Sequence, residues 1–174
     1  MGLEQKQFMM EINVVENHNK NVPTLVGTDT NWKEVSLGTY YTCAIKTTGE
    51  LYCWGDNSAG KLGDGTEEDK TVPVKIGTDK DWASITTGNY TTCAIKTNGE
   101  LYCWGQTIDF DINKTPTKVG TDLDWKNISI GWNHFCAIKT NGELYCWGDN
   151  SAGQLGDGTT IDKSMPKKIG GDNN

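Results

Sequence analysis

The chain has 174 residues, a formal net charge of −7 at pH 7 and 21 glycines. Nucleic-acid-binding proteins usually carry a basic patch, whereas the lysines here are scattered singly, so nucleic acid is not an expected partner. No apolar run reaches the roughly 18 residues of a membrane-spanning helix, and no signal peptide is visible, so no membrane association is expected either.

The first 20 residues match nothing that follows, and we treat residues 1–20 as an unmatched lead-in. Within them, Phe8–Val15 reads either as a degenerate strand or as a disordered segment. Val22–Val26 contains a proline between β-branched residues and predicts a short edge strand. The remaining chain, 21–174, is predicted to be one repeat domain with copies at about residues 32–77, 82–120 and 125–170.

The repeats are the dominant feature of the sequence. Cys43–Gly55 returns almost unchanged at Cys93–Gly105 and again at Cys136–Gly148. The tryptophans that open the three copies lie 50 and then 43 residues apart, at positions 32, 82 and 125. A period of this length predicts repeated supersecondary units that stack side by side.

Each copy reads as four short strands. In the second copy, Asp81–Thr86, Thr92–Thr97 and Glu100–Trp104 carry β-branched and aromatic residues, and Thr115–Val119 follows after a turn-rich connection. The fourth strand contains a proline in every copy, which confines it to a sheet edge because proline lacks the N–H group. Four antiparallel strands with such an edge predict an all-β fold of propeller blades.

The cysteines occur in pairs ten positions apart, one pair per repeat. A three-residue hairpin loop over Thr97–Gly99, with a glycine bulge, places Cys93 directly opposite Cys103, at bonding distance. We therefore predict three disulfides, with reduced core cysteines as the alternative. The predicted pairs are Cys43–Cys53, Cys93–Cys103 and Cys136–Cys146.

Disulfides favour an extracellular or periplasmic location, although no signal peptide is visible. A zinc site is disfavoured because the chain has no Cys-x-x-Cys and only two histidines, His18 and His134. We expect no metal and no cofactor. The six tryptophans of the repeats are the largest apolar residues, and we expect them to fill the space between neighbouring blades. They are Trp32, Trp54, Trp82, Trp104, Trp125 and Trp147.

The segment Cys136–Gly156, with its Trp-Gly-Asp-Asn-Ser-Ala-Gly-Gln-Leu-Gly signature, resembles the regulator-of-chromosome-condensation repeat family. The resemblance covers about residues 21–171 and implies blades of a seven-bladed propeller. The family includes a nucleotide-exchange factor for a small nuclear GTPase, secreted bacterial β-lactamase inhibitors and a plant UV-B photoreceptor. Gly131–His134 resembles the photoreceptor's Gly-Trp-Arg-His motif but lacks its arginine, which argues against photoreception.

Three copies do not complete a ring of the family's size. Either the chain is part of a longer protein, or copies of it assemble as a homo-oligomer that completes the ring. An open end would expose an apolar blade face and a strand edge, and both favour association.

Two groups of residues are candidates for contact with a partner. In the middle copy the turn-rich connection is seven residues shorter, and its replacement places Phe110 between two aspartates. Loops on a rigid scaffold often bind partners; the alternative is that this loop folds its own Ile and Phe inward. Tyr40, Tyr90 and Trp132 follow the glycine after the first strand, and we expect them at equivalent positions on one face of the ring. The first group is Ile108, Asp109, Phe110 and Asp111.

Candidate catalytic residues are absent from the pattern, since no Ser-His-Asp set, phosphate loop or helix with paired carboxylates can be assembled. Four aspartates in Gly-Asp turns lack the spacing of a calcium loop, so we assign them to turn formation. They are Asp56, Asp64, Asp149 and Asp157. The sequence thus predicts a non-enzymatic scaffold that binds another protein. The alternatives are guanine-nucleotide exchange on a small GTPase and a purely structural, self-assembling module.

Overall fold

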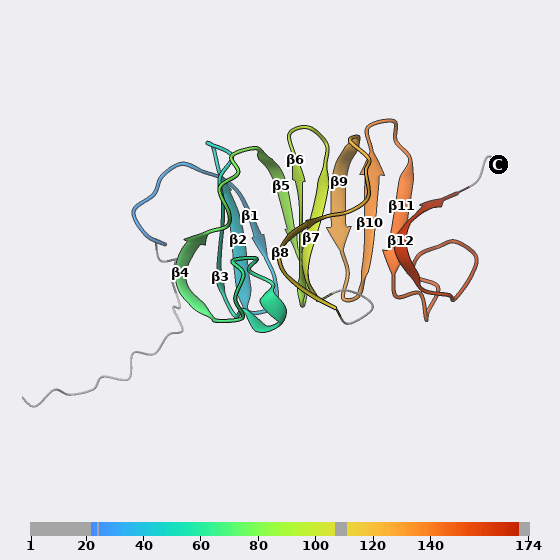
Figure 1. The fold of residues 1–174 in the computed structure, drawn as a ribbon, viewed down its shortest axis with the longest axis horizontal. Helices are drawn as coiled ribbons and strands as arrows, with labels where there is room; N and C mark the ends of the chain where they lie inside the picture. Colours follow the sequence, from blue (N-terminus) through green and yellow to red (C-terminus); the bar gives the residue numbers. More distant parts are fainter. Residues whose placement is uncertain (1–21, 24, 107–110, 171–174) are drawn as a thin grey trace, which may run out of the picture.

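The computed structural model describes residues 22–23, 25–106 and 111–170, so the predicted lead-in lies outside the described residues. The described chain forms three four-stranded antiparallel sheets that stand side by side in sequence order (Figure 1). In every sheet, consecutive strands are neighbours. The protein therefore has the predicted all-β architecture of three propeller blades.

The first blade contains β1 (Trp32–Leu37), β2 (Tyr41–Lys46), β3 (Leu51–Gly55) and β4 (Lys70–Lys75). The second blade contains β5 (Trp82–Thr87), β6 (Thr91–Lys96), β7 (Leu101–Gln106) and β8 (Ile112–Lys118). The third blade contains β9 (Trp125–Ile130), β10 (His134–Lys139), β11 (Leu144–Gly148) and β12 (Lys163–Ile169). A short 3₁₀ helix, η1 (Ser58–Gly60), lies between β3 and β4. Within the described ranges, no helix has the length and apolarity needed to cross a membrane.

The central hairpin of each blade has the predicted three-residue loop. In the second blade Ile95 pairs with Leu101, and the N–H of Gly99 donates to the carbonyl of Lys96 at 2.9 Å. Gly99 has a φ of 82°, in the left-handed region that favours glycine. This register places Cys93 opposite Cys103, and the same pairing recurs in the other two blades. All three predicted disulfides are formed, each with Cα atoms 4.1 Å apart.

The proline-bearing strands lie at the outer edge of each sheet, as predicted. β4, β8 and β12 each occupy the last place in the strand order of their blade. A proline on an edge strand costs no ladder hydrogen bond because its outward side has no neighbouring strand. The opposite edges, β1, β5 and β9, approach one another where the blades meet.

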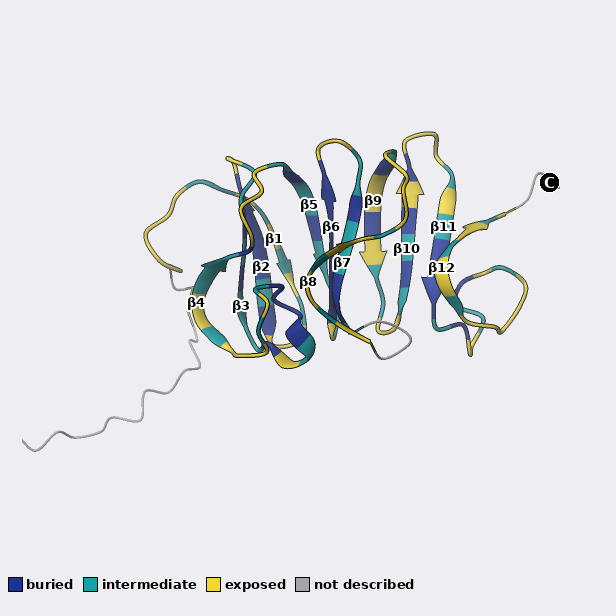
Figure 2. Ribbon diagram, in the orientation of Figure 1, coloured by how far each residue is buried: buried dark blue, intermediate teal, exposed yellow. Residues whose placement is uncertain are grey.

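The hydrophobic core consists of two layers, one at each interface between blades. In the first layer the Ile45 and Leu51 side chains of the first blade pack against Trp82 and Trp104 of the second blade. In the second layer Ile95 and Leu101 take the place of the aliphatic pair, against Trp125 and Trp147. Figure 2 shows the buried residues gathered along β2 and β6, inside the stack. Each fully buried tryptophan contributes at most roughly 4–6 kcal/mol.

Two expectations differ from the structure at the N-terminal end. Trp32 and Trp54 are only half-buried, because no preceding blade covers the face of the first sheet among the described residues. The strand predicted at 22–26 is not formed by its described residues. Val22 and Leu25 are 69% and 78% exposed, so this segment gains little from apolar burial.

Candidate protein-binding surface

Three exposed aromatic side chains lie on the turns that join the first two strands of each blade. Tyr40 is 84% exposed on the β1–β2 turn, and Trp132 is 75% exposed on the β9–β10 turn. Tyr90, on the β5–β6 turn, is 42% exposed. We call these three residues the aromatic rim. Tyr and Trp are enriched among the hot spots of protein interfaces, so the rim is a candidate contact surface.

The expected equivalence of the three rim residues is wrong by one position. The carbonyl groups of Tyr40 and Tyr90 accept hydrogen bonds from Asp56 N and Gln106 N, at 2.9 and 3.0 Å. In the third blade the corresponding bond, from Asp149 N at 2.8 Å, goes to Asn133 instead. Trp132 therefore stands one residue earlier in its turn than the two tyrosines do.

Tyr40 adopts an unusual backbone conformation. Its φ is 65°, a value that bulky residues rarely adopt because the Cβ atom crowds the backbone. Gly55 lies directly beneath it, and a Cβ atom at Gly55 would come within 2.5 Å of the Tyr40 carbonyl oxygen. Strained residues of this kind cluster at functional sites. The strain thus adds a second, independent reason to assign the rim to binding.

Lys61 holds the first two rim turns together. Its side chain is almost completely buried, and its Nζ atom donates to the carbonyl groups of Thr39 and Asn89 at 3.3 and 3.4 Å. The same ammonium group lies over the rings of Tyr41 and Tyr90, at 5.1 and 5.3 Å from their centroids. Cation–π contacts of this kind strengthen when they are shielded from water. Lys61 is therefore a positioning residue for the rim.

Sequence reasoning missed Lys61. The third copy has the neutral Gln154 at the position of Lys61, in an otherwise identical Leu-Gly turn. This difference between the two copies was the signal in the sequence that could have identified Lys61. Sequence reasoning also missed Asn57 and Asn150, which are fully buried in the connections after β3 and β11.

The aspartates of the Gly-Asp turns form turns, as predicted. The Oδ1 atom of Asp64 accepts hydrogen bonds from the N–H and hydroxyl of Thr66, at 2.9 and 2.7 Å. Asp157 and Thr159 repeat this arrangement in the third blade at the same distances. Among the described residues, no group of three or more His, Cys, Asp or Glu side chains is placed to hold a metal ion.

A lysine at the end of the second strand is enclosed in each blade, and it belongs to the core rather than to the rim. In the third blade Lys139 Nζ lies 2.7 Å from Asp122 Oδ2 and 5.1 Å from the centroid of the Trp125 ring. The hydrogen bond that Lys139 donates to the Asp122 carboxylate raises the pKa of Lys139 above its ordinary value. The ammonium group is thus charged and already paired, and it anchors the tryptophan that opens the blade.

The four predicted loop residues have different outcomes. Asp111 is exposed directly before β8, at the end of the connection that follows β7. Ile108, Asp109 and Phe110 lie outside the described residues, so their role stays a prediction. All six cysteines are in disulfides, so none supplies a free thiol.

Comparison with known protein families identifies the repeats. Two family descriptions, both named regulator of chromosome condensation (RCC1) repeat, match the chain, the first at residues 32–61 and 125–154 and the second at residues 48–95 and 141–174. Together they cover most of the chain. A comparison with curated proteins finds no match.

Comparison with solved structures shows the same fold. Yeast RCC1 (Prp20), in its structure with Kap60, superposes with a TM-score of 0.73 over 82% of this chain, at 22% sequence identity. A second structure, of Prp20p from Saccharomyces cerevisiae, gives 0.72 over 82% of the chain, also at 22% identity. This chain covers only 37% and 39% of those two chains, so it corresponds to part of such a propeller.

Proposed function

Because the chain belongs to the regulator of chromosome condensation (RCC1) repeat family, we propose that it is a non-enzymatic scaffold that binds another protein through its aromatic rim. The observation that carries the proposal is the exposure of Tyr40 and Trp132 on turns of a stack of sheets, each of which has a disulfide within its central hairpin. Exposed Tyr and Trp side chains supply large contact areas at low entropic cost, which makes them frequent hot spots of interfaces.

Structural relatives support a protein partner. Yeast RCC1 (Prp20) is bound to Kap60 in the first of these structures, and the second was described together with the binding properties of Prp20p to Gsp1p and histones. These partners belong to Prp20, of which this chain covers well under half, and only the general capacity to bind proteins is carried over. Nucleotide exchange on a small GTPase stays a prediction.

The proposed binding mode uses the rim as a set of preorganised anchors. Lys61 ties the Thr39 and Asn89 carbonyls together, so the first two turns are held before a partner arrives. Preorganisation lowers the entropy cost of association. The net charge of −7 favours a partner with a basic surface around the apolar contact.

Photocrosslinking tests this function directly. A benzophenone amino acid at position 40 or 132 should crosslink to a discrete protein in an extract of the source organism. The same group at Leu123, which is 59% exposed away from the rim turns, serves as the matched control and should not give that product. Equal products from rim and control positions would contradict the proposal.

Self-association is a second candidate, supported by the exposed end faces. Ile138 and Leu144 of the third blade are 41% and 37% exposed, whereas their counterparts Ile45 and Leu51 are fully buried against the next blade. At the other end Val35 is 61% exposed, although its counterpart Ile85 is buried. The two faces are thus the unpaired halves of one interface, and they can pack against each other between copies.

Sedimentation velocity over a range of concentrations separates this candidate from a free monomer. Leu144→Glu should abolish any multimer, because it places a charge in the centre of the proposed contact. Leu25→Glu, at a position that is 78% exposed elsewhere, should leave the multimer unchanged. A wild-type protein that stays at 19.1 kDa at all concentrations would contradict self-association.

A further inference from the structure

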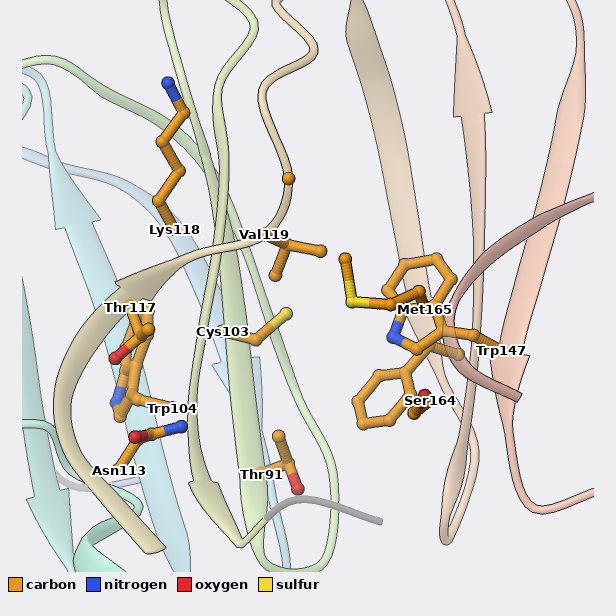
Figure 3. Close-up of a pocket in the computed structure, with 12 residues that line it drawn as sticks. Thr91, Cys103, Trp104, Asn113, Thr117, Lys118, Val119, Trp147, Ser164 and Met165 are labelled. Atoms are coloured by element: carbon orange, nitrogen blue, oxygen red, sulfur yellow. The ribbon is translucent and has the colours of Figure 1, made fainter. Parts of the chain in front are cut away.

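A cavity lies between the second and third blades. It has a volume of about 190 Å³, and its lining includes the apolar side chains of Val119, Phe135, Trp147 and Met165. Figure 3 shows the Cys103 sulfur, Val119 and Met165 pointing toward the same space. An apolar cavity of about 150 Å³ can bind benzene, so this one has room for a branched aliphatic side chain.

The corresponding space at the first interface is filled by the connection after β3. Leu62 is fully buried there and belongs to the same core layer as Trp104. Gly63 passes so close to Trp104 that a Cβ atom would come within 2.5 Å of its Nε1 atom. The N–H of Gly65 also donates to the carbonyl of Lys114, at 2.9 Å.

The strand pairings show that the cavity is the counterpart of this filled space. Gly105 pairs with Asn113 and Gly148 pairs with Lys163, which makes Ser164 the counterpart of Lys114. By the same registers Trp147 corresponds to Trp104, Val119 to Ile76 and Met165 to Thr115. The second blade has lost the Leu-Gly connection itself, because seven residues are missing from this part of its repeat.

We propose that this cavity binds an aliphatic side chain of a partner protein, presented on a glycine-containing turn like that of Leu62 and Gly63. This inference rests on the proposed function and names the kind of segment that the scaffold recognises. The cavity is continuous with the packed interface between the second and third blades, so the side chain would complete an existing core layer. The Ser164 carbonyl is placed to accept an N–H from the turn, as the Lys114 carbonyl does from Gly65.

A second copy of the chain is not the expected occupant. Its two Leu-Gly turns already bury their own leucines, since Leu62 is fully buried and Leu155 is only 2% exposed. Either turn would have to leave its own blade before it could enter the cavity of another copy. A partner whose turn is free therefore fits the cavity better.

The test measures binding of a fluorescein-labelled, cyclised peptide that copies residues 58–66, by fluorescence anisotropy on the full chain. We expect saturable binding, weakened about tenfold or more when the leucine of the peptide is replaced by asparagine. Met165→Glu should weaken binding similarly, because it places a charge at the mouth of the cavity. Val72→Glu is the matched control at the corresponding position of the first blade, and it should bind as the wild type does.

The same measurement can overturn the proposal in two ways. The absence of saturable binding, or equal binding to the wild type and Met165→Glu, would refute it. Nuclear Overhauser contacts between the Met165 methyl group and residues 107–110 of the free protein would show that the chain fills its own cavity, and would refute it as well. If the peptide fails but crosslinking at positions 40 and 132 still captures a protein, the inference fails and the proposed function stands.

Discussion

The ammonium group of Lys61 lies 3.0 Å from the Oδ1 atom of Asp56, in the seam between the first two blades. Only 2% of the lysine side chain is exposed, whereas a third of the aspartate side chain is open to solvent. A buried charge is tolerated only when it is paired and hydrogen-bonded. This contact, together with the carbonyl groups of Thr39 and Asn89, therefore helps to hold the first two rim turns in place.

Replacement of Lys61 by methionine should destabilise the protein and loosen the rim. Lys61→Met keeps the apolar stem but leaves two carbonyl groups without their buried donor, at an expected cost of about 1–3 kcal/mol. Hydrogen exchange should accelerate at residues 38–41 and 88–91 and stay unchanged at residues 131–134. Lys126→Met, at an exposed position, is the control and should change neither stability nor exchange. Uniform acceleration in all three turns would contradict a positioning role.

The disulfides should differ in their resistance to reduction. Thiol attack requires access to a sulfur atom. Both cysteines of the Cys43–Cys53 pair are fully buried, whereas Cys103 and Cys136 are partly exposed. Limited dithiothreitol treatment, followed by alkylation and peptide mass mapping, should find Cys43–Cys53 reduced last. An early reduction of Cys43–Cys53 would contradict this order. Each bridge closes a small loop, and its contribution to stability is roughly 3 kcal/mol in the chain-entropy model.

The sequence predicted what depends on local chain geometry and missed what depends on contacts between blades. Asn98-Gly99 and the cysteine spacing were sufficient for the loop length and the disulfide register, because both are properties of one hairpin. The burial of Lys61 depends on carbonyl groups supplied by the next blade, and no local pattern encodes it. The half-buried state of Trp32 likewise depends on which blade stands next to it.

The rim shows the same division. The sequence located Tyr40, Tyr90 and Trp132 on the correct turns, since each follows the glycine after a first strand. It placed Trp132 one position too late in its turn. Tyr40 and Tyr90 are each the second residue after the glycine, whereas Trp132 directly follows Gly131. The cavity was missed because sequence reasoning considered only which residues the shortened connection contains, and not the Leu-Gly turn that is missing from it. The Leu-Gly turn that it had lost leaves a space between two blades.

Two outer-edge ion pairs should make stability depend on pH in the acidic range. Hydrogen bonds from Lys118 and Lys168 lower the pKa values of Glu100 and Glu143 from 4.5 to about 2. Because these pKa values are lower in the folded than in the unfolded protein, the two carboxylates stabilise the fold at pH values above their unfolded pKa. This contribution is lost as the pH falls from about 4.5 toward 2. Urea unfolding of the wild type and of the double variant Glu100→Gln/Glu143→Gln should differ most at pH 7. The two unfolding curves should converge near pH 2, and a constant difference at all pH values would contradict the assignment.

Asn57 and Asn150 should differ in their contribution to stability although their contacts are alike. The side-chain Oδ1 of Asn57 accepts from Leu62 N at 2.9 Å, and that of Asn150 accepts from Leu155 N at 3.0 Å. The connection that contains Leu62 is wedged against Trp104 of the next blade, whereas no described blade follows the connection that contains Leu155. Asn57→Ala should therefore lower the free energy of unfolding by about 2–3 kcal/mol, through unpaired buried groups and a loosened core layer.

Asn150→Ala should cost about 1 kcal/mol, because water at the open end can replace part of the lost hydrogen bonding. Chemical denaturation of the two variants, side by side with the wild type, measures both values. Equal losses would show that the carboxamide acts only within its own loop. A larger loss for Asn57→Ala would show that it also supports the interface between the first two blades.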